Sequence, residues 1–215
     1  MRFIFATVAA LTTCAAQAET RDITADVWVD NWFSMSANGE VVLEDSVPIT
    51  TERSFNKETA TFSVDLPAVI AIEAKDFKEN DTGLEYIGTD RQQMGDGGMI
   101  AQFKDAVSGE TLAVTDADMK CLVVHFAPAE PSCADEANPV AGEGACEFVA
   151  TDIPADWTAP DFDDSDWPAA IVHSAADVGP KDGYDEITWD DSAKLVWGEN
   201  LKQDNTLLCR LTISE

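Results

Sequence analysis

The residues of this chain that could do chemistry are mainly oxygen donors grouped in short loops. Asp76, Glu79, Asn80 and Asp81 lie close together just before Gly83. Ca²⁺ requires hard oxygen ligands around a turn, so this loop predicts a calcium site, although the alternating spacing and terminal Glu of an EF-hand are absent. Because the chain has 41 acidic residues, such clusters also arise by chance. Two other runs offer the same atoms: Asp161, Asp163, Asp164 and Asp166, and the segment 182–186.

A second group of polar residues lies in the glycine-rich segment 88–98. Arg91 is one of few arginines, and its guanidinium could donate paired hydrogen bonds to a sugar hydroxyl or a carboxylate. Gln92 and Gln93 could hydrogen-bond an uncharged polar ligand, and the glycines after Asp96 would let the backbone approach it closely. These four residues are therefore the predicted ligand-binding site. The alternative is an internal salt bridge for Arg91 and a simple turn for the glycines.

The chain contains only two histidines, and each ends an apolar, strand-like run. His125 follows Leu-Val-Val and His173 follows Ala-Ile-Val. If the two runs were neighbours, a pair of imidazoles in an exported protein would suit copper better than Zn²⁺, which usually has three or four protein ligands. A histidine that is simply hydrogen-bonded at a strand end is the competing interpretation.

No sequence motif indicates an enzyme. The chain lacks a Gly-x-Ser-x-Gly turn, a His-Glu-x-x-His helix, a phosphate loop and a dinucleotide fingerprint. Paired carboxylates for glycoside hydrolysis carry no weight where acids are this frequent. No catalytic residue is predicted, and an uncharacterised hydrolase ranks third among the functions considered.

The N-terminus indicates export. Arg2, an apolar run from Phe3 to Leu11, and a small-x-small site at 16–18 predict a signal peptide over residues 1–18. The predicted location is therefore periplasmic or extracellular. A lipid anchor at Cys14 is a weaker alternative, because Thr13 is bulkier than the residue usual before a lipobox cysteine.

The remaining four cysteines predict two disulfides, because an even count is typical of exported chains. Three pairings are open. We favour Cys133–Cys146, which would close a Pro/Ala/Gly-rich loop, and Cys121–Cys209, which would join two strand-like segments. A thiolate metal site is disfavoured because no Cys-x-x-Cys occurs.

The formal net charge is −28, from 41 acidic and 13 basic residues. Such a surface repels nucleic acid and anionic membranes and attracts cations. After the signal peptide no apolar run approaches the roughly 18 residues that a membrane span needs. Solubility in a saline medium explains the charge most simply. The chain is expected to be monomeric or weakly associated, with a small molecule or glycan as its partner.

Most of the chain alternates with the period of two that is typical of strands. Trp28–Gly39 predicts a β-hairpin that closes at Asn38-Gly39, and Ser108-Gly109 marks another. Residues 68–74 are almost continuously apolar, which predicts a central strand, and a single helical turn is expected near Ser174. The predicted strands are 23–29, 33–37, 40–43, 59–64, 68–74, 99–103, 111–114, 121–126, 169–173, 193–197 and 206–213.

Aromatic residues bracket the acidic segment Phe162-Asp-Asp-Ser-Asp-Trp167, and Trp157 precedes it. This pattern, the later Leu195–Gly198 strand and Val27–Asn31 with its Asn-Gly turn resemble galactose-binding-like jelly-roll domains. The two pieces stand in the reverse of the usual order. The resemblance implies a jelly-roll fold and carbohydrate binding, with Trp157, Phe162 and Trp167 largely structural.

These observations predict one all-β domain over residues 19–215, an antiparallel β-sandwich of jelly-roll type with long acidic loops and a surface loop near 127–146. The leading predicted function is non-catalytic carbohydrate or polyol binding with loop-bound calcium. Copper binding by His125 and His173 is the alternative.

Overall fold

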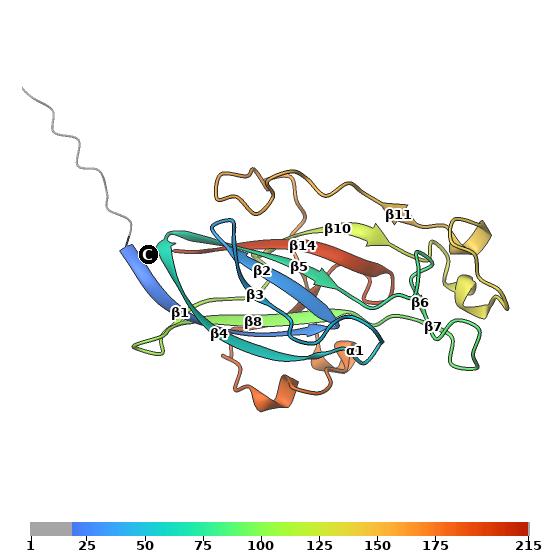
Figure 1. The fold of residues 1–215 in the computed structure, drawn as a ribbon, viewed down its shortest axis with the longest axis horizontal. Coiled ribbons are helices and arrows are strands. Elements are labelled where there is room, and N and C mark those ends of the chain that lie inside the picture. The colour runs from blue at the N-terminus through green and yellow to red at the C-terminus, as the bar shows by residue number, and fades with distance from the viewer. Residues whose placement is uncertain (1–18, 215) are drawn as a thin grey trace, which may run out of the picture.

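A computed structural model describes residues 19–214, and the predicted signal peptide lies outside them. Two six-stranded antiparallel sheets face each other, which confirms the predicted β-sandwich (Figure 1). Sheet A runs in the order β12-β13-β8-β1-β4, with β9 also paired to β8, and sheet B in the order β11-β10-β14-β5-β2-β3. The strands of sheet A are Ile171–His173 (β12), Leu195–Trp197 (β13), Gly98–Asp105 (β8), Glu19–Asp30 (β1), Asn56–Leu66 (β4) and Thr111–Val114 (β9).

The second sheet contains the strand predicted to be central. Ala68–Lys75 (β5) lies between β14 and β2, and its inward side chains Ile70 and Ile72 are fully buried. The other strands of sheet B are Val149–Ala150 (β11), Lys120–Phe126 (β10), Asp204–Ile213 (β14), Trp32–Ala37 (β2) and Glu40–Glu44 (β3), and a separate two-stranded sheet pairs Leu84–Glu85 (β6) with Gln93–Met94 (β7).

The predicted hairpins form, but the first is shorter than the sequence suggested. Asn38 and Gly39 have φ angles of 49° and 89° and join β2 to β3. Trp28 belongs to β1 in sheet A, so the chain crosses between the sheets at Asn31. Alternation explains this placement: Val27 and Val29 face the inter-sheet core, whereas Trp28 faces outward and is covered by Tyr184.

Helical structure is confined to the connections. The turn predicted near Ser174 is α1 (Ala175–Val178), capped by the Ser174 side chain, which accepts from the Asp177 amide. Within the described residues, no helix is long and apolar enough to cross a membrane. The short 3-10 helices are η1 (Pro131–Asp135), η2 (Gly144–Cys146) and η3 (Tyr184–Glu186).

Both favoured disulfides are present. Cys121–Cys209 joins β10 to β14 in register, and Cys133–Cys146 closes the surface loop between η1 and η2. The Cys133 and Cys146 side chains are fully buried against Leu84 of β6, so this bond holds the loop against the small sheet. Two disulfides are typical of an oxidising compartment outside the cytoplasm.

Candidate functional site

Four carboxylates meet inside one end of the sandwich. Asp30 ends β1, Asp76 follows β5, Glu85 lies in β6, and Asp96 lies between β7 and β8. Oxygens of Asp30, Asp76 and Asp96 lie within 4.8 Å of one another. Figure 1 shows β6 and β7 at the end of the molecule opposite the C-terminus. We call Asp30, Asp76, Glu85 and Asp96 the carboxylate cluster.

Strand register brings the cluster together. Asp30 at the end of β1 pairs with Gly98 at the start of β8, which places Asp96 near the same point. The Asn31 amide donates to the Lys75 carbonyl (2.7 Å), so the end of β5 meets the end of β1. Asp76 is the next residue after Lys75, and it therefore enters the space between the sheets.

Several oxygens of the cluster are buried without a hydrogen bond. Asp76 is 2% exposed, and neither of its carboxylate oxygens has a partner. Oδ1 of Asp30 and Oε1 of Glu85 are also unpartnered, and both residues are at least 99% buried, with exposures of 0% and 1%. An unpaired buried charge costs far more than a buried apolar group, so such groups normally pair or coordinate a metal.

Asp30, Asp76 and Glu85 therefore have raised pKa values and bind protons more tightly than isolated carboxylates do. Burial is the largest cause and raises the pKa of Asp30 and of Glu85 to about 7 each, with the neighbouring Asp96 adding to both shifts. Burial, followed by repulsion from Asp30 and Glu85, raises the pKa of Asp76 well above its usual value. A bound cation would supply the positive charge that these buried carboxylates lack.

One lysine already compensates part of this charge. Lys181 Nζ lies 2.9 Å from Asp96 Oδ2 and 3.3 Å from Asp30 Oδ2, and the chain carries it between α1 and η3. Burial alone would lower the pKa of Lys181, but attraction to Asp30 and Asp96 outweighs burial and raises it. No ion pair involves Asp76 in the described part of the chain, so the innermost carboxylate is left uncompensated.

The glycines after the Arg91 loop contact the protein itself. A Cβ on Gly95 would lie 1.8 Å from Asp76 Oδ2, so only glycine lets the backbone close over that carboxylate. A Cβ on Gly97 would lie 2.4 Å from the Trp197 ring. Gly97 and Gly98, the two glycines after Asp96, were predicted to let the backbone approach a ligand, and in the structure they lie against the buried Trp197 and Val178 side chains.

A cleft of about 310 Å³ lies on the outer side of this backbone, lined by Gln93, Asp96, Ala134 and Lys202 among others. Asp96 is only partly buried, so it links the cluster to the cleft. Gln93 donates to Glu85 Oε2 (2.8 Å), so this predicted ligand-binding residue also contacts the cluster. An ion could enter from this side.

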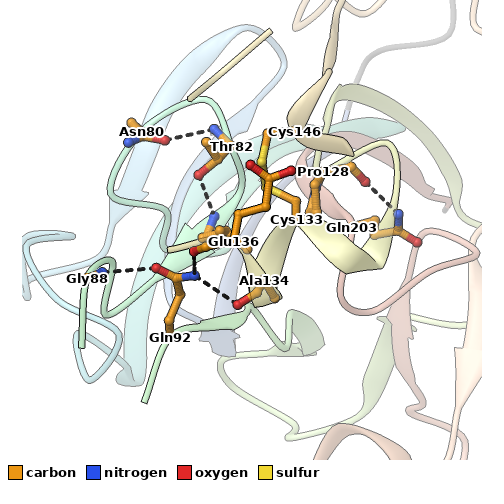
Figure 2. Close-up of a disulfide and its surroundings, with 11 residues drawn as sticks. Asn80, Thr82, Gly88, Gln92, Pro128, Cys133, Ala134, Glu136, Cys146 and Gln203 are labelled. Carbon is orange, nitrogen blue, oxygen red and sulfur yellow. Dashed lines mark hydrogen bonds between the residues drawn. A yellow bond between two sulfur atoms is a disulfide. The ribbon is translucent and has the colours of Figure 1, made fainter. Parts of the chain in front are cut away.

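The wall of the cleft is held by Gln92 (Figure 2). Its amide nitrogen donates to the carbonyls of Ala134 and Glu136, both at 2.8 Å, and its amide oxygen accepts from the Gly88 amide. This side chain, predicted to bind ligand, joins the 88–98 loop to the disulfide-closed loop. Gln203, also shown in Figure 2, donates to the Pro128 carbonyl and holds the start of the latter loop.

Arg91 has a different environment from the other predicted ligand-binding residues. It is exposed, and its guanidinium lies over the Tyr86 ring, 3.9 Å from the centroid. Tyr86 in turn hydrogen-bonds to Glu52 through its hydroxyl. Arg91 therefore lies on an exposed aromatic platform and makes no direct ion pair with the cluster.

The predicted calcium loop is divided. Asp76 joins the carboxylate cluster, but Glu79 accepts from the Ile87 amide and Asn80 from the Thr82 amide, both at 2.9 Å. Asp81 accepts from Lys78 Nζ at 2.5 Å. The residues of this loop thus have separate partners, and only Asp76 belongs to a group of three ligand atoms.

The two histidines lie in different sheets and share no partner. His125 on β10 bonds through Nδ1 to Asn205 Oδ1 (3.0 Å) and stacks on Phe148. Its Nε2 lies 3.3 Å from Asp81 Oδ1. His173 on β12 bonds through Nε2 to the Gly198 carbonyl (2.9 Å). Within residues 19–214, no group of three metal-ligating side chains includes a histidine.

The acidic segment between the tryptophans has a structural cation. Arg210 on β14 is 3% exposed and donates from Nε to Asp164 Oδ2 at 2.7 Å. Its other nitrogens donate to the carbonyls of residues 157, 159 and 162. Trp167 packs edge-on against Phe162. This arrangement agrees with the structural role that the sequence resemblance implied for the aromatic residues.

The cluster offers a buried, all-oxygen environment, which is the donor set of Ca²⁺, Mg²⁺ or Mn²⁺ and not of copper or zinc. Sequence reasoning missed Asp30 and Glu85. A usable signal was present, because Asp30 and Asp76 each come at the end of an apolar strand, where a carboxylate is carried inward.

Comparisons with known proteins add no relative: no family model, no curated protein and no solved structure matches this chain.

Proposed function

We propose that this exported β-sandwich binds one divalent cation, Ca²⁺, at the carboxylate cluster. The observation that carries the proposal is Asp76, a carboxylate 2% exposed whose two oxygens have no partner and face two further carboxylates within 4.8 Å. Leaving it without a cation costs the desolvation of a buried charge, and a bound ion would offset that cost.

Calcium fits better than the alternatives for two reasons. The available donors are all carboxylate oxygens, which excludes a preference for copper or zinc. Mg²⁺ keeps most of its water and demands octahedral geometry, whereas Ca²⁺ dehydrates readily and tolerates irregular sets of six to eight oxygens. In an oxidising compartment outside the cell, the ion would join the ends of β1, β5 and β8.

The test is calcium titration of the mature protein, purified without a histidine tag and treated with chelator. Calorimetry should show one site, and thermal unfolding should move to higher temperature as calcium is added, because a ligand that binds only the folded state stabilises it. Asp76→Asn should abolish both effects. Asp90→Asn, an exposed carboxylate of the neighbouring loop, is the matched control and should retain them. Identical calcium responses of the Asp76 and Asp90 variants would refute the proposal.

Glycan binding is a second candidate, favoured by the exposed stack of Arg91 on Tyr86. A guanidinium over an aromatic ring presents a flat face with hydrogen-bond donors at its rim, and a polar cleft of about 420 Å³ lined by Gly88, Asp90 and Glu136 adjoins it. Arg91→Ala should leave folding unchanged and remove retention on a polysaccharide column. If retention survives, the loop is not the recognition surface.

A further inference from the structure

We infer that Lys181 is an internal cation that holds the carboxylate cluster when calcium is absent, and that bound Ca²⁺ displaces its ammonium group. This inference rests on the proposed function and deepens it, because it names what regulates the affinity of the site. It makes calcium binding an exchange of one cation for another.

The geometry places both cations at the same oxygens. Lys181 Nζ bonds to Oδ2 of Asp96 (2.9 Å) and lies 3.3 Å from Oδ2 of Asp30, and these carboxylates are two of the three that surround the proposed ion. Ca²⁺ takes six to eight oxygens. An ion bound where Asp30, Asp76 and Asp96 converge therefore draws on the two carboxylates that Lys181 contacts.

Electrostatics also favours displacement of the Lys181 ammonium by Ca²⁺. An ammonium and Ca²⁺ that shared these oxygens would repel each other, because both cations would lie within contact distance of the same carboxylates. The divalent ion interacts with Asp30, Asp76 and Asp96 together, whereas Lys181 contacts only Asp30 and Asp96. The ion therefore replaces the lysine rather than joining it.

The local backbone lets the side chain leave without unfolding. The Asp182 carbonyl accepts from Trp28 Nε1 (3.1 Å), and Lys57 pairs with Glu186 (3.2 Å), so both bonds anchor the segment on the outer face of sheet A. The Lys181 side chain is 37% exposed and passes over the Phe55 ring, with Nζ 5.1 Å from its centroid. Rotation of this side chain alone would carry Nζ into solvent.

The first measurement is calcium affinity in lysine variants. Lys181→Met removes the competing cation, and we expect its calcium dissociation constant to fall about tenfold or more, within the 5–150-fold range typical of coupled binding events. Lys181→Arg keeps the charge and should keep an affinity close to the original. Lys202→Met is the matched control, because Lys202 lines the cleft beside Asp96 but forms no ion pair among the described residues. Circular dichroism in chelator checks that each variant is folded.

The second measurement reports the displacement itself. Acetylation of lysines by an amine-reactive ester, mapped by mass spectrometry, should be faster at Lys181 with calcium than with chelator, while Lys57 and Lys202 react equally in both. A rise in affinity without faster labelling would mean that Lys181 acts only through its field, and this overturns displacement. Equal affinities and equal labelling overturn the inference but leave calcium binding intact. Absence of calcium binding in every protein would instead overturn the proposed function, and the inference with it.

Discussion

Two acidic regions of this molecule differ in how their charge is compensated. In the Trp157–Trp167 segment, Asp164 accepts from buried Arg210, which also binds three backbone carbonyls. In the carboxylate cluster, Asp76 is more deeply buried, and neither of its carboxylate oxygens has a hydrogen-bond partner among residues 19–214. The charge of Asp164 is compensated within the folded chain, whereas the charge of the carboxylate cluster is compensated only in part, by Lys181. Acidic sequence alone does not distinguish a structural loop from a binding site; the partner of each buried oxygen does.

The largest expected effect on stability is in the Trp157–Trp167 segment, where Arg210 compensates the acidic charge. Arg210→Met should lower the free energy of unfolding by about 3–5 kcal/mol, because it leaves the half-buried Asp164 carboxylate and three backbone carbonyls without their donor, and each buried group left unsatisfied costs about 1–3 kcal/mol. Urea denaturation of the metal-free protein measures this. A loss below about 1 kcal/mol would show that the segment does not depend on Arg210 for its stability. The two acidic regions would then no longer differ in this respect.

Asp164→Asn is a milder change in the same region. The asparagine keeps an acceptor oxygen for Arg210 but lacks the negative charge, so the bond loses its charge assistance and the free energy of unfolding should decrease by about 1–2 kcal/mol. Asp163→Asn is the control, because the exposed Asp163 bonds to the neighbouring Ser165 and forms no ion pair within residues 19–214. Equal losses in both variants would contradict a special role for Asp164.

Asp76→Asn should have the opposite sign. In chelator above pH 7 it removes the cost of a buried charge and the repulsion of that charge by Asp30 and Glu85, so we expect the free energy of unfolding to increase. The same urea denaturation measures it. Destabilisation comparable to that of Asp164→Asn would make the two regions equivalent and would break the comparison.

The pH dependence of stability should also separate the two regions. Burial raises the pKa values of Asp30 and Glu85 to about 7, above those of the unfolded chain, so the folded protein binds more protons between about pH 4 and pH 7. The cluster's contribution to stability in chelator should therefore fall as pH rises through that window and level off above it. Melting temperatures measured across this range for the original protein and Asp30→Asn test the sign. A variant that shows the same decrease as the original would place its cause outside the cluster.

The smallest expected effect is on the wall of the cleft. Gln92→Ala removes two hydrogen bonds to carbonyls of the disulfide-closed loop and should cost about 1 kcal/mol. Calcium affinity should change little, because Gln92 does not touch the cluster. Amide hydrogen exchange in residues 131–137 should become faster, and unchanged exchange would show that the disulfide alone holds this loop.

Much of the fold was predictable because it depends on local pattern. Alternation of apolar residues identified β1, β4 and β10, the Asn38-Gly39 turn identified the β2–β3 hairpin, and cysteine parity predicted both disulfides. The first two signals depend only on neighbouring residues. Cysteine pairing is not local, but four cysteines allow only three pairings. The crossing of the chain at Asn31 was missed, because alternation says which face a residue takes and not which sheet its strand joins.

The sequence by itself indicated most of the strands and determined the number of disulfides and the acidic character of this protein. Only the tertiary structure decided which acids matter, since Asp30, Asp76 and Asp96 are distant in the chain and meet where the ends of β1, β5 and β8 converge. With 41 acidic residues, composition cannot single them out. What distinguishes them is exclusion from water without a hydrogen-bond partner, a property set by the packing of the two sheets and by the close passage of Gly95 over Asp76.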